Sequence, residues 1–322
     1  MLELPDFAKK QILVFTPKDG DKISYRNDNL VIKDKEDKIK YQCTCYQIFS
    51  LIIIGNVSIT SGLILCAERF KYSVCLMNTS LRTYHIIANG LEGNTLLHEK
   101  QYSYHGLEIA RYLITNKIEN QLAALNRIRH KVPATRDAID KLYGYINKLD
   151  SDSIESIQTI MGIEGSASRV YFSQIFSNTK WIGRRPRTKC DYINTCLDIG
   201  YTILFNFIEC LLQLYGFDVY YGVLHRCFYM RKSLVCDIQE PFRPIIDWKI
   251  RCAINLGQIK EDDFEIINNQ YVLKYNRNAE YVSLFVREIL EYKEDIFRYV
   301  QKYYRCFMKQ NPIDKFYKFE MK

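Results

Sequence analysis

One glutamate in an apolar helix constrains this chain more than any other feature. Residues 154–176 read IESIQTIMGIEGSASRVYFSQIF, and at 100° per residue their apolar side chains share one narrow stripe. Glu164 lies in the middle of that stripe. A helix that buries this face also buries a carboxylate, which is costly unless a cation, a proton or a metal ion accompanies it. The stripe consists of Ile157, Ile160, Met161, Ser168, Tyr171 and Ile175.

Two interpretations of Glu164 stay open at this point. The simpler one is a buried glutamate that pairs with an arginine in a helical core. The other is a ligand-binding position, because the residues around Glu164 are small and allow another backbone or a ligand to approach closely. These small neighbours are Gly162, Gly165, Ser166, Ala167 and Ser168.

The composition indicates an ordinary globular protein with one large domain or two smaller ones. The chain has 322 residues, of which 48% are hydrophobic and 25% charged, so it is long enough to bury a sizeable core. Lys and Arg outnumber Asp and Glu by 45 to 37, an excess that is compatible with a polyanionic partner. The 11 scattered cysteines favour reduced thiols over a disulfide framework or a zinc module. We therefore expect a cytoplasmic protein.

An apolar run at residues 193–215 has the length of a membrane span. Three polar side chains interrupt it, so we interpret it as a buried helix that Asp191 caps and that ends near Gly216. On this interpretation the protein has no membrane partner. The interrupting residues are Asp198, Asn206 and Glu209.

The hydrophobic pattern predicts an α+β fold, with a small β-rich domain followed by a larger all-α domain that would carry the chemistry. Residues 11–87 have the period of strands, including a hairpin around an Asn-Asp-Asn turn. From about residue 102 the period becomes helical, and a final amphipathic helix is expected over 278–310. The predicted boundaries are 1–88 for the β-rich domain, which we expect to mediate dimerisation, 89–101 for a linker and 102–322 for the helical domain.

Three segments of the helical part carry side chains of the kind that bind divalent metal ions. Glu164 is the first, and His225 in the segment YYGVLH is the second. The third is the pair Asp237 and Glu240, whose spacing of three residues makes them neighbours on a helix surface. Carboxylates with one imidazole suit Mg²⁺ or Mn²⁺. The simpler alternatives are a structural histidine and a solvated acidic pair.

A basic stretch follows Glu164 directly. No acidic residue occurs between Gly165 and Cys190. Such a run is often only a solvated surface. Here it adjoins carboxylates that would repel a phosphate unless a metal ion neutralised them, so the combination predicts a phosphate-binding site. The basic residues are Arg169, Lys180, Arg184, Arg185, Arg187 and Lys189.

Four sequence blocks occur in a fixed order within residues 155–250. They are MGIEGSASRVYF, then WIGRRPR with DYINTCLDIGYTIL, then GVLH, and last SLVCDIQEPFRPIID. Together they resemble the signature blocks of the CRISPR-associated adaptation integrase and endonuclease family, the universal spacer-acquisition Cas proteins. The segment NKIENQLAAL at 116–125 is similar to the first helical block of that family. One block alone is a weak signal, whereas four in order with the right separations are specific.

The resemblance implies a role for each matching residue. Glu164 in GIEG, His225 in GVLH and Glu240 in DIQEPFR match the divalent-metal ligands and catalytic residues of the family. Asp237 matches a nearby acidic position and is a further candidate ligand. The last ligand is aspartate in many members, and the glutamate here is similar to the branch found beside single-protein effectors. The residues expected to contact DNA are Arg169, Arg184, Arg185, Arg187 and Arg243.

The resemblance also implies an activity, the insertion of protospacer DNA into a CRISPR repeat during antiviral defence. The 3′-hydroxyl of the protospacer would attack a repeat phosphodiester with the help of Mg²⁺ or Mn²⁺, and water as attacker would give an endonuclease. The expected partners are a second copy of this chain, the smaller adaptation protein, and protospacer and repeat DNA. Two alternatives remain: a metal-dependent nuclease for branched or repair DNA, and a non-catalytic DNA-binding scaffold.

Overall fold

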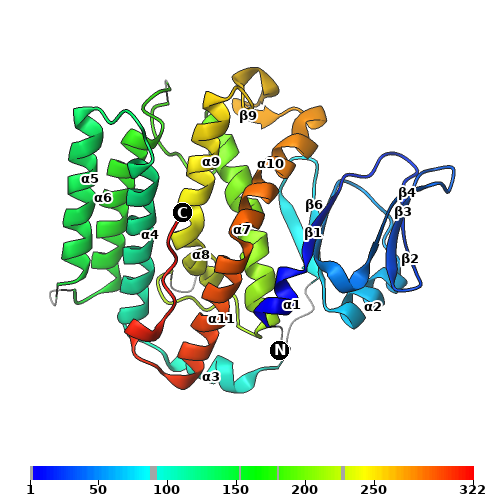
Figure 1. The fold of residues 1–322 in the computed structure, drawn as a ribbon, viewed down its shortest axis with the longest axis horizontal. Coiled ribbons are helices and arrows are strands. Elements are labelled where there is room, and N and C mark those ends of the chain that lie inside the picture. Colours follow the sequence, from blue (N-terminus) through cyan, green and yellow to red (C-terminus); the bar gives the residue numbers. More distant parts are fainter. Residues whose placement is uncertain (1–2, 88–92, 152–153, 180, 226–228) are drawn as a thin grey trace.

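The computed structural model describes residues 3–87, 93–151, 154–179, 181–225 and 229–322. Its N-terminal part is rich in strands and the rest is mostly helical, as Figure 1 shows. This arrangement confirms the predicted α+β class, with the β-rich part first. All ten cysteines in the described ranges are free thiols.

A four-stranded sheet lies next to the helical part. Its strand order is β1-β5-β6-β7, with β1, β5 and β6 parallel and β7 antiparallel to β6. The central strand β5 (Ile48–Ile54) is buried at every position, and its sequence is almost continuously apolar because packed layers cover both of its faces. The other strands are β1 (Gln11–Phe15), β6 (Ser73–Met77) and β7 (Thr83–Ile87).

The two faces of β5 belong to two different cores. Leu51 and Ile53 pack in a smaller core with α2 (Ser61–Phe70). Ile52 and Ile54 pack in the larger core, which continues into the helical part of the chain. This division follows from the two-residue period of a strand, which sends successive side chains to opposite faces. The sheet is therefore packed directly on the helices.

A second, antiparallel sheet contains β2 (Lys22–Arg26), β3 (Asn29–Lys33) and β4 (Ile39–Thr44), in that order. The turn between β2 and β3 consists of Asn27 and Asp28, both with left-handed backbone angles, at φ 49° and 58°. Asn and Asp tolerate this conformation better than other non-glycine residues, which makes them typical of tight hairpins. The hairpin predicted around the Asn-Asp-Asn turn is confirmed.

The helical part contains two groups of helices. The first is α4 (Glu108–Asn126), α5 (Pro133–Leu149) and α6 (Ile157–Ile175), which pack side by side (Figure 1). The second surrounds α7 (Tyr192–Leu214) and consists of α8 (Ser233–Gln239), α9 (Arg243–Asn255), α10 (Asn278–Glu291) and α11 (Lys293–Lys309). A hairpin of β8 (Phe264–Ile267) and β9 (Gln270–Leu273) adjoins the second group.

Helix α7 is the one helix within the described ranges that is long and apolar enough to cross a membrane. Inside the protein, 83% of its most apolar window is buried, so it packs as a core helix, as predicted. Asp191 caps it by accepting a hydrogen bond from the backbone N–H of Asn194 at 2.7 Å. The helix ends before Gly216, whose φ of 78° is typical of a glycine that stops a helix.

Part of the stretch predicted as a linker, 89–101, is helical. Helix α3 (Thr95–Ser103) begins where the side chain of Asn94 accepts a hydrogen bond from the backbone N–H of Leu97. Gln101 then fixes the helix, because its side chain donates to the carbonyl of Asp218 at 3.0 Å and accepts from its N–H at 2.9 Å. Residues 89–92 of that stretch lie outside the described residues.

The single helix predicted over 278–310 is in fact two helices, α10 and α11. The backbone at Tyr292 leaves the helical conformation, with φ −107° and ψ 8°. Directly after this break, Lys293 donates hydrogen bonds to the carbonyls of Ala8 at 2.7 Å and Lys10 at 2.9 Å. Helix α11 therefore contacts the N-terminal helix α1 (Leu4–Ala8), which hydrophobic periodicity alone does not specify.

The C-terminal segment 316–322 lies along α4 and pairs with asparagine side chains of that helix. Asn116 donates to the carbonyl of Phe319 at 2.7 Å and accepts from its N–H at 3.1 Å. Asn120 accepts from the N–H of Met321 at 2.7 Å. The two side chains therefore form hydrogen bonds with backbone groups of the tail, as a neighbouring strand would in a sheet.

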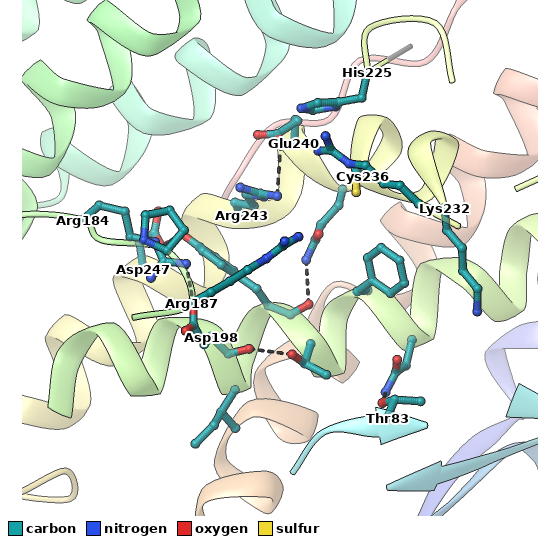
Figure 2. Close-up of a pocket in the computed structure, with 18 of the residues that line it drawn as sticks. Thr83, Arg184, Arg187, Asp198, His225, Lys232, Cys236, Glu240, Arg243 and Asp247 are labelled. Carbon is teal, nitrogen blue, oxygen red and sulfur yellow. Dashed lines mark hydrogen bonds and ion pairs between the residues drawn. The ribbon is translucent and has the colours of Figure 1, made fainter. Parts of the chain in front are cut away.

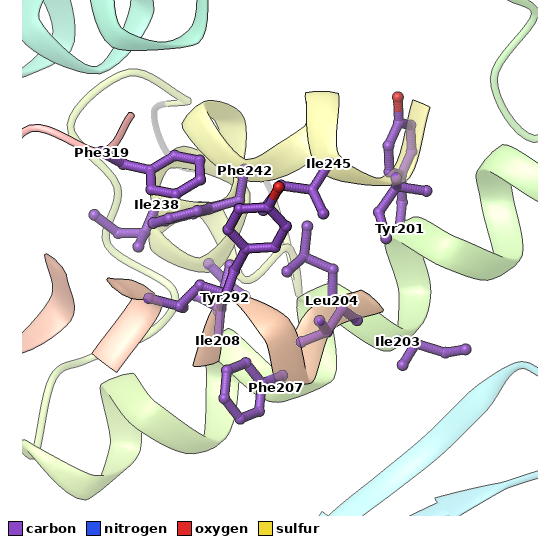
Figure 3. Close-up of a cluster of buried hydrophobic side chains, with 14 of the residues drawn as sticks. Tyr201, Ile203, Leu204, Phe207, Ile208, Ile238, Phe242, Ile245, Tyr292 and Phe319 are labelled. Carbon is purple, nitrogen blue, oxygen red and sulfur yellow. The ribbon is translucent and has the colours of Figure 1, made fainter. Parts of the chain in front are cut away.

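The ring of Phe319 completes a buried cluster that Figure 3 shows. It contacts Phe242, with ring centroids 4.6 Å apart, and Tyr292, with centroids 5.8 Å apart. Phe242 belongs to a single 3₁₀ turn, η2 (Glu240–Phe242), that connects α8 to α9. The tail thus packs on the turn that carries one of the predicted ligands.

Replacing Phe319 with alanine should lower the free energy of unfolding by about 3–5 kcal/mol, the usual effect of truncating a buried phenylalanine. Its side chain is only 1% exposed. Urea unfolding followed by circular dichroism would measure the change. Tyr275→Ala is the control, since Tyr275 is 57% exposed and should change stability by less than about 0.5 kcal/mol. An unaltered midpoint for Phe319→Ala would contradict the role given to the tail.

Candidate active site

Helix α6 presents Glu164 beside the buried face that the sequence predicts. Ile157, Ile160 and Tyr171 are buried, while the Glu164 side chain remains 27% exposed. Met161, which was expected on the buried stripe, is 44% exposed and lines a large cavity. The stripe is therefore narrower than predicted, because the cavity opens along the edge of α6 that carries Met161.

The partner of Glu164 is a lysine. Lys117 of α4 has a side chain that is 6% exposed, and its ammonium group contacts Oε1 of Glu164 and lies 2.7 Å from Oε2 of Glu240. The sequence interpretation did not single out Lys117. A signal was present, however, because Lys117 follows Ile114 by three residues and precedes Gln121 by four, and both are buried on the same helix.

Glu240 stands on η2 and is 3% exposed. Its Oε1 lies 3.2 Å from Nη2 of Arg243. Burial alone would raise the pKa of Glu240, but Arg243 and Lys117 outweigh that effect and lower it to about 2. Burial would likewise raise the pKa of Glu164, and Lys117 instead holds it below its ordinary value. Both carboxylates are therefore charged at neutral pH.

His225 is oriented by Asp237. Its Nδ1 lies 2.7 Å from Oδ1 of Asp237, so this nitrogen carries the proton and Nε2 is left as an acceptor. Asp237 is fully buried and also accepts three backbone hydrogen bonds, from Val223 at 2.7 Å, Leu224 at 3.0 Å and His225 at 3.0 Å. Four donors therefore occupy its two oxygens, and the role of Asp237 as a further metal ligand stays a prediction.

A glycine is required where the chain wraps around this carboxylate. A Cβ atom at Gly222 would lie 2.6 Å from Oδ2 of Asp237 and 2.8 Å from the carbonyl of His225. Both distances are too short for a side chain, so the GVLH segment begins with the one residue that fits. The carboxylate–histidine pair resembles the arrangement in which an acidic group orients a metal-binding imidazole.

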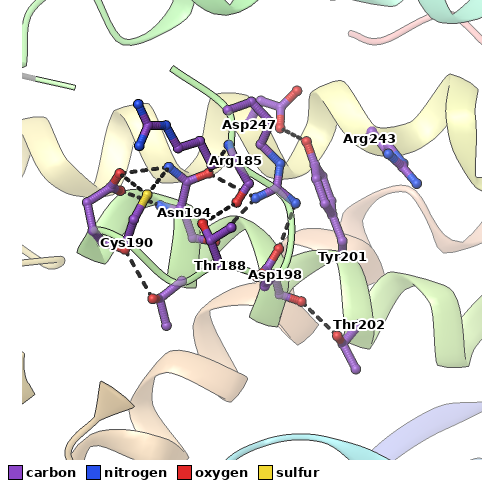
Figure 4. Close-up of polar contacts among 12 residues, drawn as sticks. Arg185, Thr188, Cys190, Asn194, Asp198, Tyr201, Thr202, Arg243 and Asp247 are labelled. Atoms are coloured by element: carbon purple, nitrogen blue, oxygen red, sulfur yellow. Dashed lines mark hydrogen bonds and ion pairs between the residues drawn. The ribbon is translucent and has the colours of Figure 1, made fainter. Parts of the chain in front are cut away.

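A second polar cluster adjoins the first at Arg243, which Figure 4 shows beside Tyr201. The ring of Tyr201 lies between two guanidinium groups, that of Arg184 at 5.4 Å and that of Arg243 at 5.0 Å. Its hydroxyl donates to Asp247, and burial raises the pKa of that carboxyl group to about 6. Arg184 also pairs with Asp198 at 2.6 Å. Arg184 and Arg243 are thus held in place by neighbours within the site.

The remaining arginines predicted to contact DNA are exposed on the structure. Arg169 and Arg187 line the cavity, whereas Arg185 does not. Arg185 and Arg187 belong to a loop that is fixed to α7. The side chain of Asn194 on that helix accepts a hydrogen bond from the N–H of Arg185 at 2.8 Å and donates one to the carbonyl of Gly183 at 3.0 Å. Lys180 lies outside the described residues.

One cavity of about 1950 Å³ connects these groups. Its wall includes α6, α7, the 182–189 loop, the α8–η2–α9 segment and the turn before β7. Figure 2 shows His225 and Glu240 near one end, with Arg184 and Arg187 farther along. Among the described residues of the wall, nine are Lys or Arg and five are Asp or Glu. This excess of positive charge suits a polyanion.

Two carboxylates and an imidazole are side chains of the types that bind a divalent metal ion. Glu164 and Glu240 converge on one point, and His225 lines the same cavity. Oε2 of Glu240 is buried and lies 2.7 Å from the Lys117 ammonium group, so it already accepts one cation. In the part of the chain described here, however, no three His, Cys, Asp or Glu side chains are close enough to form a metal cage. The Lys117 ammonium lies between the two carboxylates.

Comparison with known proteins supplies an independent finding. Residues 14–287 match the family model of CRISPR associated protein Cas1. The protein named CRISPR-associated endonuclease Cas1 1 of Thermodesulfovibrio yellowstonii is 35% identical over 278 residues, which cover 76% of this chain and 87% of that protein. The range that matches the family model, residues 14–287, includes Glu164, His225 and Glu240.

Two solved structures share the fold. A chain of a Cas6-RT-Cas1–Cas2 complex superposes with a TM-score of 0.80 at 23% identity, over 98% of this chain and 36% of that longer one. A casposase bound to its integration product superposes with a TM-score of 0.74 at 21% identity, over 93% of this chain and 91% of that one. At these identities, the similarity establishes the architecture.

Replacing Asp237 with asparagine should lower the free energy of unfolding by roughly 1–3 kcal/mol for each donor left unpaired. The amide offers one oxygen, so its NH₂ group must face at least one of the donors that now point at the carboxylate. Urea unfolding would measure the loss. Asp140→Asn is the matched control, since Asp140 is exposed. Equal stability of the two variants would contradict the geometry.

Proposed function

The chain belongs to the CRISPR associated protein Cas1 family, and on that premise we propose that it is a divalent-metal-dependent DNA integrase and endonuclease of spacer acquisition. The observation that carries this proposal is the convergence of two charged carboxylates, Glu164 and Glu240, beside an oriented histidine in a basic cavity. Acids and bases in this combination suit phosphoryl transfer, where charge develops on phosphate oxygens.

Glu164, Glu240 and His225 are the residues that would hold Mg²⁺ or Mn²⁺. Such an ion, when bound, would polarise the scissile phosphate of the CRISPR repeat. The protein itself contributes orientation: Asp237 keeps Nδ1 of His225 protonated and leaves Nε2 as an acceptor. Arg243 pairs with Oε1 of Glu240 and adds positive charge to the wall of the cavity where a phosphate would bind.

The proposed reaction is a transesterification. The 3′-oxygen of the protospacer forms a bond to the repeat phosphorus while the bond from that phosphorus to the repeat 3′-oxygen breaks. The proton of the attacking hydroxyl ends on the departing 3′-oxygen, so the number of phosphodiester bonds is unchanged. The cations along the cavity would hold the DNA backbone in line for this attack.

The proposed partners follow from the family and from the surface of the protein. One similar structure is named a Cas6-RT-Cas1–Cas2 complex, which supports an assembly with the smaller adaptation protein. The β-rich part exposes Tyr46, Ile64 and Leu65, at 62%, 41% and 64%, and such apolar side chains support dimerisation through this domain. The basic cavity supports binding of protospacer and repeat duplexes.

The test is a set of single substitutions, Glu164→Ala, His225→Ala and Glu240→Ala. Each should reduce strand transfer of a 3′-hydroxyl duplex into a repeat target by about 100-fold or more, because each removes a group that faces the reacting phosphate. Binding of the same duplex, measured by fluorescence anisotropy, should change little. Glu155→Ala is the matched control, because Glu155 is exposed and lies just before the helix that carries Glu164.

The same experiment separates the proposal from its alternatives. A wild-type protein that binds the duplex but yields neither strand-transfer product nor cleavage would indicate a DNA-binding scaffold. A wild-type protein that cuts branched DNA in Mn²⁺ but yields no strand-transfer product would indicate a repair nuclease. Both results would count against an integrase.

A further inference from the structure

Lys117 occupies the point where the two carboxylates of the site meet. Its ammonium group contacts Oε1 of Glu164 and lies 2.7 Å from Oε2 of Glu240. The residue belongs to the middle of α4, and its neighbours Asn116 and Asn120 hold the C-terminal tail. The backbone of α4 around Lys117 is therefore held by the C-terminal tail, and the Lys117 side chain reaches from α4 to both α6 and η2.

The charges in this cluster balance without any bound ion. Lys117 and Arg243 carry two positive charges, and Glu164 and Glu240 carry two negative ones. Two buried carboxylates this close would repel each other if nothing neutralised them, and an unpaired buried charge is strongly destabilising. Lys117 is the one group in the described structure that contacts both acids, so it holds α6 and η2 together electrostatically.

The contacts of Lys117 are also the ones that a metal ion would need. Arg243 pairs with Oε1 of Glu240 at 3.2 Å, whereas Lys117 pairs with Oε2 at 2.7 Å. On Glu164, the hydroxyl of Ser168 donates to the same oxygen that Lys117 contacts, at 2.8 Å. Loss of Lys117 from the pair would therefore leave each carboxylate with one partner and one direction open to an ion.

The position of Lys117 allows it to leave without unfolding the helix. Its side chain and Glu164 both line the cavity, so an ion can approach from that side. A lysine reaches its partners through a flexible four-carbon stem and can move its ammonium group by rotation about single bonds. An arginine, with a planar and more extended head, would be harder to displace in the same space.

We propose that Lys117 is the resident counter-cation of the metal site, which holds Glu164 and Glu240 together before a divalent ion binds and is displaced from them when it does. This inference rests on the metal dependence proposed above. It makes Lys117 a positioning residue that stabilises the metal-free site and, by competing for the same oxygens, lowers the affinity of the site for the ion.

The experiment compares the full-length protein with Lys117→Met, which keeps an unbranched side chain of nearly the same length and removes its charge. In EDTA the variant should unfold about 5 °C below the wild type, because two buried carboxylates then repel each other. In calorimetric titration it should bind Mn²⁺ about tenfold more tightly, since no ammonium group competes. Lys302→Met is the matched control, because Lys302 is exposed, and it should behave as the wild type.

A second variant keeps the test informative if Lys117→Met is too unstable to purify. Lys117→Met combined with Glu164→Gln removes one charge of each sign, so it should recover most of the melting temperature in EDTA. Failure of the double variant to recover would overturn the role of the charge balance, as would an unchanged melting temperature in Lys117→Met.

The Mn²⁺ titration distinguishes this inference from the proposed function. Unchanged or weaker Mn²⁺ binding by Lys117→Met, beside clear binding by the wild type, would overturn the displacement while the metal dependence stands. No Mn²⁺ binding by either protein would overturn the metal dependence and the displacement together.

Discussion

A buried glutamate, Glu240, and a partly buried one, Glu164, share one lysine, and the rest of the helical part is arranged so that this contact is possible. Glu164 comes from α6, Glu240 from the turn after α8, and Lys117 from α4. None of the three can be buried alone without a large electrostatic penalty. Their mutual contact therefore fixes the relative positions of three segments that are far apart in the sequence, and it places them on the wall of a basic cavity.

Neighbouring interactions hold the segments around this cluster in position. The Asp237 carboxylate accepts hydrogen bonds from the backbone N–H groups of the GVLH segment and from the ring of His225. The C-terminal tail pairs with α4 and packs Phe319 on the turn that bears Glu240. The site is thus built on helices and turns whose own backbones are satisfied, a property that precise catalytic geometry requires.

Sequence alone predicted the fold class, the capped core helix after Asp191 and the need of Glu164 for a partner. These succeeded because each depends on local chemistry: periodicity, a capping side chain, or a charge on an apolar face. The role of Asp237 in holding the GVLH segment was not predicted, since only the folded chain shows that three backbone N–H groups reach its carboxylate. The break at Tyr292 and helix α3 depend on distant partners, and periodicity does not include them.

Lys117 shows most clearly what the sequence leaves out. It lies in the segment 116–125, which is similar to the first helical block of the family. No feature of the local sequence distinguishes a lysine that contacts two acids from a lysine on a solvated face. The partner expected for Glu164 was an arginine or a metal ion, and the structure places a lysine there. Long-range pairing of this kind becomes visible only when α4, α6 and η2 are packed together.

The most direct test of the account is a crystal structure of the full-length protein soaked in Mn²⁺, with anomalous diffraction data to locate the ion. We predict a single strong anomalous peak in contact with a carboxylate oxygen of Glu164, Oε2 of Glu240 and Nε2 of His225. Asp237 should remain hydrogen-bonded to Nδ1 of that ring. A peak elsewhere in the cavity, with Lys117 still between the two glutamates, would contradict the account.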